Sequence, residues 1–293
     1  MRITNKVLVK GYLGDLSTNL RNMRKLQEQL SSGREIRRPS DDPFRVARTM
    51  ELTTGISLNE RYAKNIDEGL GWLETTETAL GQMGEAMKRI RELCVQGGNG
   101  SYNENQRDPI KLEVEQLKEQ LIQIGNTAFE GRYIFGGDKT TNPPFVKENG
   151  ELVYKGTDNN LLREFSQGVA IGVGVPGNNF DKIFLKKGDN VVDKIIDKLS
   201  TNQSPSDLLG ELDTAFDGVL NLRAEVGAKA KRLEVMKAKN EEETFNMTEL
   251  LSKTADIDVA EKIMQYKVME SVYIASLQSS GKILQQSLLD YLR

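Results

Sequence analysis

The last stretch of the chain, residues 259 to 293, constrains the fold most strongly. The seam positions of a heptad pattern recur here at alternating steps of four and three, and no proline interrupts them: Val259, Ile263, Tyr266, Glu270, Tyr273, Leu277, Ser280, Leu284, Ser287 and Tyr291. This spacing is typical of a coiled-coil helix, whose apolar seam has to be covered by a partner. Glu270, Ser280 and Ser287 interrupt the seam, which favours a reversible assembly element over a stable dimer.

A second seam with the same alternation lies near the start of the chain, at Leu13, Leu16, Leu20, Met23, Gln27 and Leu30. A single helix of this kind is marginally stable in water and cannot bury its own stripe. We therefore predict that the two ends assemble with each other and with neighbouring copies, and that they order late. The predicted assembly residues are Leu13, Leu16, Leu20, Met23, Leu30, Ile263, Tyr266, Tyr273, Leu277, Leu284 and Tyr291.

The composition narrows the classes of function. The 293 residues include no histidine and one cysteine, and the net charge is -3. The commonest general base and metal ligand is therefore missing, as is any internal disulfide or cysteine-cluster metal site. The charge gives no basic surface for nucleic acid. We expect no catalysis, no cofactor and no metal, although carboxylate or lysine chemistry remains open.

No run of about 18 apolar residues occurs in the sequence, so we expect no membrane insertion. Residues 1 to 6, MRITNK, lack the apolar core of a cleavable signal peptide. We expect either a cytosolic protein or one exported by a route that reads an uncleaved terminus.

Helix signals organise the rest of the chain. Gly33 ends the first helix, and Asp42 with Pro43 suits the N-cap and first position of the next, which makes capping the better interpretation of the adjacent acids Asp41 and Asp42. That helix reaches about Lys64. A second follows, with or without a bend between the two, to the break at residues 97 to 100.

Cys94 lies on the apolar stripe of this second helix, which predicts a buried and unreactive thiol. Further helices are predicted from Ile110, over residues 191 to 199, and from an N-cap and N1 pair at Ser204 and Pro205. The break at residues 255 to 258 precedes the terminal helix.

Between Arg132 and Gly188 the pattern becomes extended, with predicted strands at residues 145–146, 151–154, 161–165, 169–175 and 183–185. The run from Gly172 to Gly177 matches the dinucleotide pattern GxGxxG. A dinucleotide site needs a helix directly after it within a βαβ unit, so a strand and turn is the better interpretation.

These elements predict a mainly α fold with a small β insert, in which both chain ends build a long antiparallel helical rod. We expect a terminal assembly domain of residues 1–40 with 259–293, a rod of residues 41–137 with 189–258, and an outer β-domain of residues 138–188.

Several motifs occur in an order that resembles the flagellin family of bacterial flagellar axial proteins: residues 30–33 (LSSG), 39–43 (PSDDP), 77–80 (ETAL), 89–96 (RIRELCVQ) and 280–293. Within that family, residues 126–137 (NTAFEGRYIFGG), followed by residues 143–145 (PPF), resemble the members that join hook to filament more than the filament subunits.

The resemblance implies a secreted structural adaptor of the flagellum, placed between the hook-side junction protein and flagellin and exported unfolded by the flagellar type III apparatus. It implies contacts with copies of itself, and with a cytoplasmic export chaperone through the C-terminal helix. It also implies subunit contacts in the rod at Arg89, Arg91, Glu92 and Leu93. The alternatives are an atypical flagellin and a carboxylate-dependent or glycan-acting enzyme in the β insert.

Overall fold

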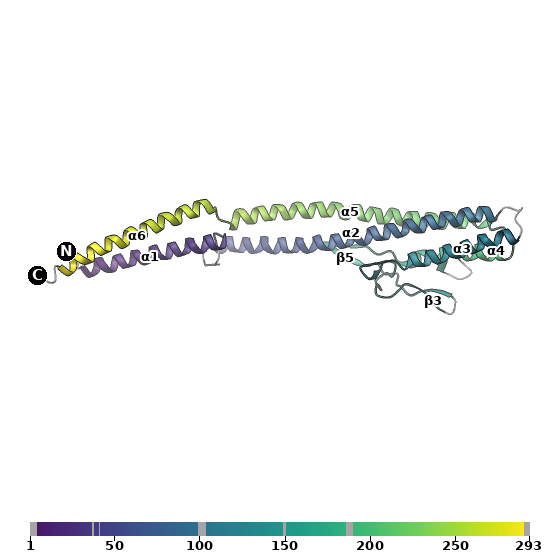
Figure 1. Ribbon diagram of the computed structural model, residues 1–293, viewed down its shortest axis with the longest axis horizontal. Coiled ribbons are helices and arrows are strands. Elements are labelled where there is room, and N and C mark those ends of the chain that lie inside the picture. Colours follow the sequence, from purple (N-terminus) through teal and green to yellow (C-terminus); the bar gives the residue numbers. More distant parts are fainter. Residues whose placement is uncertain are drawn as a thin grey trace. The chain divides into compact units, whose positions relative to one another are not determined.

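A computed structural model describes residues 5–36, 38–40, 42–98, 104–148, 151–185 and 190–289 (Figure 1). Its helices are α1 (Asn5–Ser32), α2 (Pro43–Gly97), α3 (Glu104–Gly125), α4 (Val191–Ser200), α5 (Leu209–Ala255) and α6 (Val259–Leu289). Three short β-hairpins lie between α3 and α4. The predicted mainly α fold with a small β insert is confirmed. Within the described ranges, no helix is apolar enough over a sufficient length to cross a membrane.

Packing divides the chain into two units. Unit 1 comprises residues 1–58 with 244–293, and unit 2 comprises residues 59–243. Helices α2 and α5 therefore each contribute to both units. The domain boundaries expected from the sequence, after residues 40, 137, 188 and 258, stay a prediction.

In unit 1, α1 and α6 lie antiparallel and side by side (Figure 1). The predicted cap of α2 is confirmed, because Asp42 Oδ1 accepts hydrogen bonds from the amides of Phe44 at 3.1 Å and Arg45 at 3.0 Å. Asp258 caps α6 in the same way, accepting from the amide of Ala260 at 2.9 Å. Helix α1 ends where predicted, at Gly33, whose φ of +69° lies in the left-handed region that glycine adopts without strain.

In unit 2, the apolar stripe predicted on α2 is buried except for Leu70, which is half-buried. The other members are at most 1% exposed: Ile66, Leu73, Leu80, Met83, Met87, Ile90 and Cys94. They pack in one core with side chains of α3, α4 and α5. The two helices predicted before and after Lys64 are one, since α2 continues through that point without a break. Helix α3 begins before the predicted Ile110, and Pro109 lies inside it. The sequence missed this first turn because its polar residues carry no apolar period.

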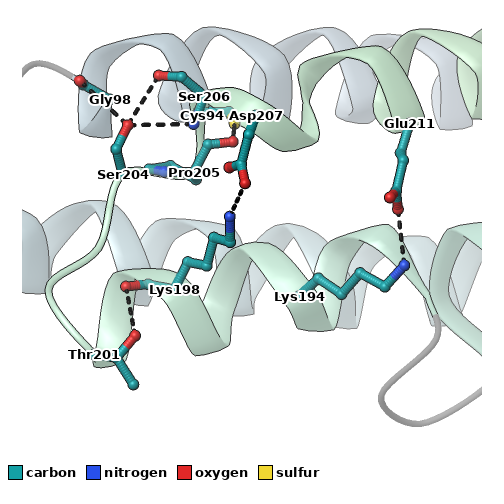
Figure 2. Close-up of polar contacts among 10 residues, drawn as sticks. All are labelled: Cys94, Gly98, Lys194, Lys198, Thr201, Ser204, Pro205, Ser206, Asp207 and Glu211. Carbon is teal, nitrogen blue, oxygen red and sulfur yellow. Dashed lines mark hydrogen bonds and ion pairs between the residues drawn. The ribbon is translucent and has the colours of Figure 1, made fainter.

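Helix α5 begins differently from the prediction. A 3₁₀ turn, Ser206–Leu208, precedes the first α-helical residue, Leu209. Ser204 Oγ still accepts from the Ser206 amide at 3.4 Å, and the thiol of Cys94 donates to the Pro205 carbonyl at 3.2 Å (Figure 2). Two ion pairs connect α4 to this region: Lys198 with Asp207 of the 3₁₀ turn, and Lys194 with Glu211 of α5 at 2.8 Å (Figure 2).

The strands form three separate antiparallel pairs, and the first pair precedes the predicted β insert. They are β1 (Ala128–Phe129) with β2 (Arg132–Tyr133), β3 (Phe145–Glu148) with β4 (Glu151–Tyr154), and β5 (Leu162–Ser166) with β6 (Val169–Gly172). In the second pair Phe145 lies opposite Tyr154. The hairpins reach into the common core, in which Phe145, Phe165, Phe180 and Phe184 are buried.

One predicted strand is wrong. Residues 183–185 belong to a π-helical turn, Asp181–Leu185, in which Ile183, Phe184 and Leu185 are all buried. A short run that is apolar on every side has no period that separates a strand from a helical turn. The interpretation of the glycine-rich run is confirmed, because β6 ends at Gly172 and Gly177 begins a 3₁₀ turn of four residues.

Candidate assembly surface

The contact between α1 and α6 is narrow. Half-buried side chains follow one another at steps of three and four on each helix: Val9, Tyr12, Leu16, Asn19, Met23, Leu26 and Leu30 on α1, and Lys262, Tyr266, Met269, Tyr273 and Ser276 on α6. The Tyr12 hydroxyl donates to the Ser276 carbonyl. None of the described side chains of α1 or α6 belongs to the buried core. The helix pair therefore buries little apolar surface by itself.

The predicted assembly residues divide between two faces. Leu16, Met23, Leu30, Tyr266 and Tyr273 lie half-buried in the α1–α6 contact. The remaining described ones are exposed: Leu13 (57%), Leu20 (48%), Ile263 (48%) and Leu277 (44%). Leu284 lies in α6, but its side chain is outside the described part, and Tyr291 is outside the described residues altogether. Each predicted seam thus combined residues of a covered face with residues of an open one.

The open residues of the two helices point to the same side. An α-helix turns about 100° per residue. Around the axis of α1, Leu13 and Leu20 are therefore rotated by roughly 90° from the side chains that contact α6. The same count places Ile263, Ile274 and Leu277 roughly 90° beyond the contact face of α6. Because the helices are antiparallel, equal offsets lie on one side of the pair. We call these five residues the shared face; all five are exposed.

Helix α6 carries a further apolar stripe on another side. Met264, Val268 and Val272 are exposed and lie roughly 120° from the contact face in the opposite direction. We call these three residues the outer stripe. A helix that is apolar around most of its circumference is normally buried on most sides. Only one side of α6 is covered by α1, so two sides are left for other partners.

The loops that join the helices of unit 1 are bonded to each other. The Glu35 amide donates to the Ala255 carbonyl at 2.7 Å, and the Ile257 amide donates to the Gly33 carbonyl at 3.1 Å. Arg45 Nη2 bonds the Glu35 carboxylate at 2.8 Å and the Thr254 carbonyl at 2.7 Å. The end of α1, the start of α2 and the end of α5 are therefore tied together. Sequence reasoning missed this cluster, because backbone groups and residues far apart in the chain make it.

The predicted rod contacts are engaged within unit 2. Arg89 bonds Glu113 at 2.7 Å and Glu92 at 2.9 Å, and Arg91 bonds Asp213 at 2.7 Å. These carboxylates raise the pKa of both guanidinium groups. The prediction for Leu93 needs correction, because this side chain is 1% exposed and packs in the core of the protein. A role of Arg89, Arg91 and Glu92 in contacts between copies stays a prediction.

Cys94 and Asp138 are two further titratable groups whose surroundings shift their pKa. Cys94 is buried as predicted, and desolvation, the largest cause, raises the pKa of its thiol to about 11. In the β insert, hydrogen bonds from Thr157 and Asn159 lower the pKa of Asp138. Over the described ranges, no group of three or more cysteine, aspartate and glutamate side chains is arranged to hold a metal ion.

Comparisons with known proteins show which proteins this chain is similar to. Residues 10–140 match the family model described as the bacterial flagellin N-terminal helical region. Flagellar hook-associated protein 3 of Escherichia coli strain K12 is 24% identical, and the match covers 96% of this chain and 98% of that protein. The chain resembles proteins of the flagellin family. A flagellin of Bacillus subtilis strain 168 is 26% identical over 91% of this chain and 90% of its own length.

A solved structure has the same fold. The flagellar hook-associated protein of Vibrio parahaemolyticus superposes with a TM-score of 0.67 at 22% identity, over 74% of this chain and 100% of that one. The segment that resembles the junction members of the family, residues 126–137, forms the β1–β2 hairpin. The side chain of its first residue, Asn126, binds the backbone of Phe145 at the start of β3. It donates to the Phe145 carbonyl at 2.8 Å and accepts from the Phe145 amide at 3.0 Å.

Proposed function

We propose that this chain is the structural adaptor that joins the hook-side junction protein to the flagellin filament. It lies outside the cell as part of the bacterial flagellum. The open apolar surface of α1 and α6 carries the proposal, because a subunit with two uncovered apolar faces on one helix requires several neighbours. The similarity to hook-associated protein 3 of Escherichia coli along nearly the full length of both chains supports the position in the flagellum.

The two open faces suit a tube. A helical array needs heterologous contacts, in which one surface of a subunit meets a different surface of its neighbour and the contacts do not close on themselves. The shared face and the outer stripe are two such surfaces. Copies of this chain, the hook-side junction protein and flagellin are the partners that we assign to them. The assignment includes no reaction, cofactor or metal.

Export is the second part of the proposal. The thin α1–α6 contact allows the terminal helices to unfold at small cost, so the chain can pass unfolded through the flagellar type III apparatus. A cytoplasmic chaperone that covers the apolar surface of α6 would prevent early polymerisation. Hydrogen exchange on the purified monomer tests this part: strong amide protection throughout residues 7–30 and 259–277 would contradict it.

Deletion of the gene in the source bacterium, followed by electron microscopy, tests the position in the flagellum. We expect hooks that carry no filament, with flagellin released into the medium, and restoration by the wild-type gene. The alternative of a flagellin has its own support in the Bacillus subtilis match. Shortened or missing filaments above an intact junction would favour that alternative and contradict the adaptor.

The shared face is tested in the same strain. Leu277→Asp should fail to restore filaments, because a carboxylate replaces an apolar contact, whereas Gln278→Asp changes an exposed polar neighbour and should restore them. Circular dichroism of both purified variants controls for folding. Normal filaments on the Leu277→Asp strain would contradict the role of the shared face.

A further inference from the structure

The N-terminal segment carries a positive charge that the rest of the chain does not. Residues 1–40 hold nine lysine and arginine residues against three acids, although the whole chain has a net charge of -3. In the described part of α1, Lys10, Arg21, Arg24 and Lys25 are exposed. We call these four residues the basic stripe. A row of exposed basic side chains attracts an anionic partner.

The basic stripe borders the shared face. Its members are rotated by roughly 110° to 210° from the side chains of α1 that contact α6, and Leu13 and Leu20 lie between the contact and the stripe. The hydrogen bond from Tyr12 to Ser276 sets the antiparallel register of the pair. It places Ile274 of the shared face at about the level of Leu13. One side of the helix pair therefore has an apolar centre with a basic margin along α1.

The other charges on this side leave the surface positive. On α6, Lys267 is exposed and lies beyond the shared face, roughly 140° from the side chains that contact α1. The two acids of the described helix stretches on this side are paired: Glu28 with Arg24 at 3.9 Å, and Glu270 with Lys267 at 2.8 Å. The other members of the basic stripe have no carboxylate partner among the described residues.

An anionic membrane surface fits this side of the pair. Helices that lie on a bilayer combine an apolar strip, which enters the boundary between headgroups and acyl chains, with lysine and arginine side chains that bind anionic headgroups. Nucleic acid offers phosphates but no apolar layer for Leu13 and Leu20. An acidic protein surface would have to match the positions of Lys10 and Arg21, which are about three turns apart, whereas a charged bilayer requires no such match.

We propose that the shared face and the basic stripe together bind the surface of an anionic phospholipid bilayer. The two helices lie in the plane of the surface and do not cross it. Because the shared face is also assigned to neighbouring subunits, a bilayer and a neighbour exclude each other there. The inference is independent of the proposed place in the flagellum, since it concerns one copy of the chain and a lipid surface.

Flotation of the full-length monomer with lipid vesicles tests the proposal. Binding to vesicles of equal parts phosphatidylglycerol and phosphatidylcholine should be at least about tenfold tighter than to phosphatidylcholine alone. Salt at about 0.5 M should remove most of this difference, because it screens the charges. No binding to the anionic vesicles, or equal binding to both kinds, would overturn the proposal. If no protein floats and sedimentation without lipid shows a dimer, the proposal is overturned in favour of a second copy.

Charge reversal tests the basic stripe itself. Lys10→Glu with Arg21→Glu should weaken binding to the anionic vesicles by at least about tenfold. Arg232→Glu with Lys239→Glu is the matched control: it makes the same change in net charge at exposed positions of α5 and should bind like the wild type. An equal loss in both variants, or no loss in the first, would overturn the proposal. If circular dichroism shows that the first variant loses helix, Lys10→Gln with Arg21→Gln is read by the same criterion.

Discussion

The ring of Phe165 occupies the space that a side chain on Gly69 would need. A Cβ on Gly69 would lie 2.6 Å from Cε1 of this ring, well inside van der Waals contact. Phe165 is 1% exposed, so it has little room to move. The absence of a side chain in the middle of α2 therefore positions the β5–β6 hairpin on the rod, and the sequence of a helix determines where the insert binds.

Gly69→Ala should destabilise unit 2 by about 1–3 kcal/mol, because the added methyl group overpacks against the Phe165 ring. Urea unfolding followed by fluorescence of Trp72, the one tryptophan in the sequence and a buried residue of unit 2, measures this change. Gly81→Ala is the matched control. At Gly81 the nearest side-chain atom would be 3.8 Å away, an ordinary contact, so the higher helix propensity of alanine should stabilise by about 0.5–1 kcal/mol. Equal effects of the two substitutions would contradict the steric argument.

Asp42→Ala should weaken the start of α2 by about 1 kcal/mol, because the amides of Phe44 and Arg45 lose their acceptor. Faster hydrogen exchange in the first turns of α2 is the expected readout. Asp42→Asn keeps a side-chain oxygen at the cap and should exchange like the wild type. If the alanine and asparagine variants behave alike, the capping oxygen is not the cause.

The Cys94 thiol should be nearly inert in the folded protein. Burial raises its pKa to about 11, so little thiolate exists at pH 8. Alkylation by iodoacetamide should be about 100-fold slower in the native protein than in guanidinium chloride, from the thiolate fraction alone. Rapid alkylation under native conditions would show that the end of the rod opens readily.

The same pKa predicts a loss of stability at alkaline pH. The thiol ionises at lower pH in the unfolded chain than in the folded one, so its contribution is complete below about pH 9 and declines as the pH rises toward 11. Urea unfolding at a series of pH values should therefore show a steeper decline between pH 9 and 11 for the wild type than for Cys94→Ala. Parallel declines would contradict the assigned pKa.

The sequence predicted the helices better than the faces they use. Heptad spacing located α1 and α6, and Asp42 with Pro43 located the start of α2, because caps and periods are local signals. The same spacing placed Leu13 in one seam with Leu16, although the structure exposes the first and half-buries the second. A stripe wider than one seam looks the same in sequence whether one face or two are covered. Which faces of a helix are buried depends on the elements that pack against it.

Features made by distant residues were not predictable. Arg45 binds Glu35 and the Thr254 carbonyl, and no sequence period relates these positions. Residues 183–185 of the π-helical turn were predicted as a strand for a related reason, since their side chains are buried in a core whose other members lie far away in the sequence. In both places the tertiary environment determines the structure.

The central claim is that the shared face of α1 and α6 is covered by neighbouring subunits in the flagellum. Accessibility of Ile263→Cys and Leu277→Cys measures this directly, because the native Cys94 is buried and adds little background. Both positions should be labelled rapidly by a maleimide in the purified monomer and at least about tenfold more slowly in isolated flagella, where packing excludes the reagent. Equal labelling rates in the monomer and in assembled flagella would contradict the account.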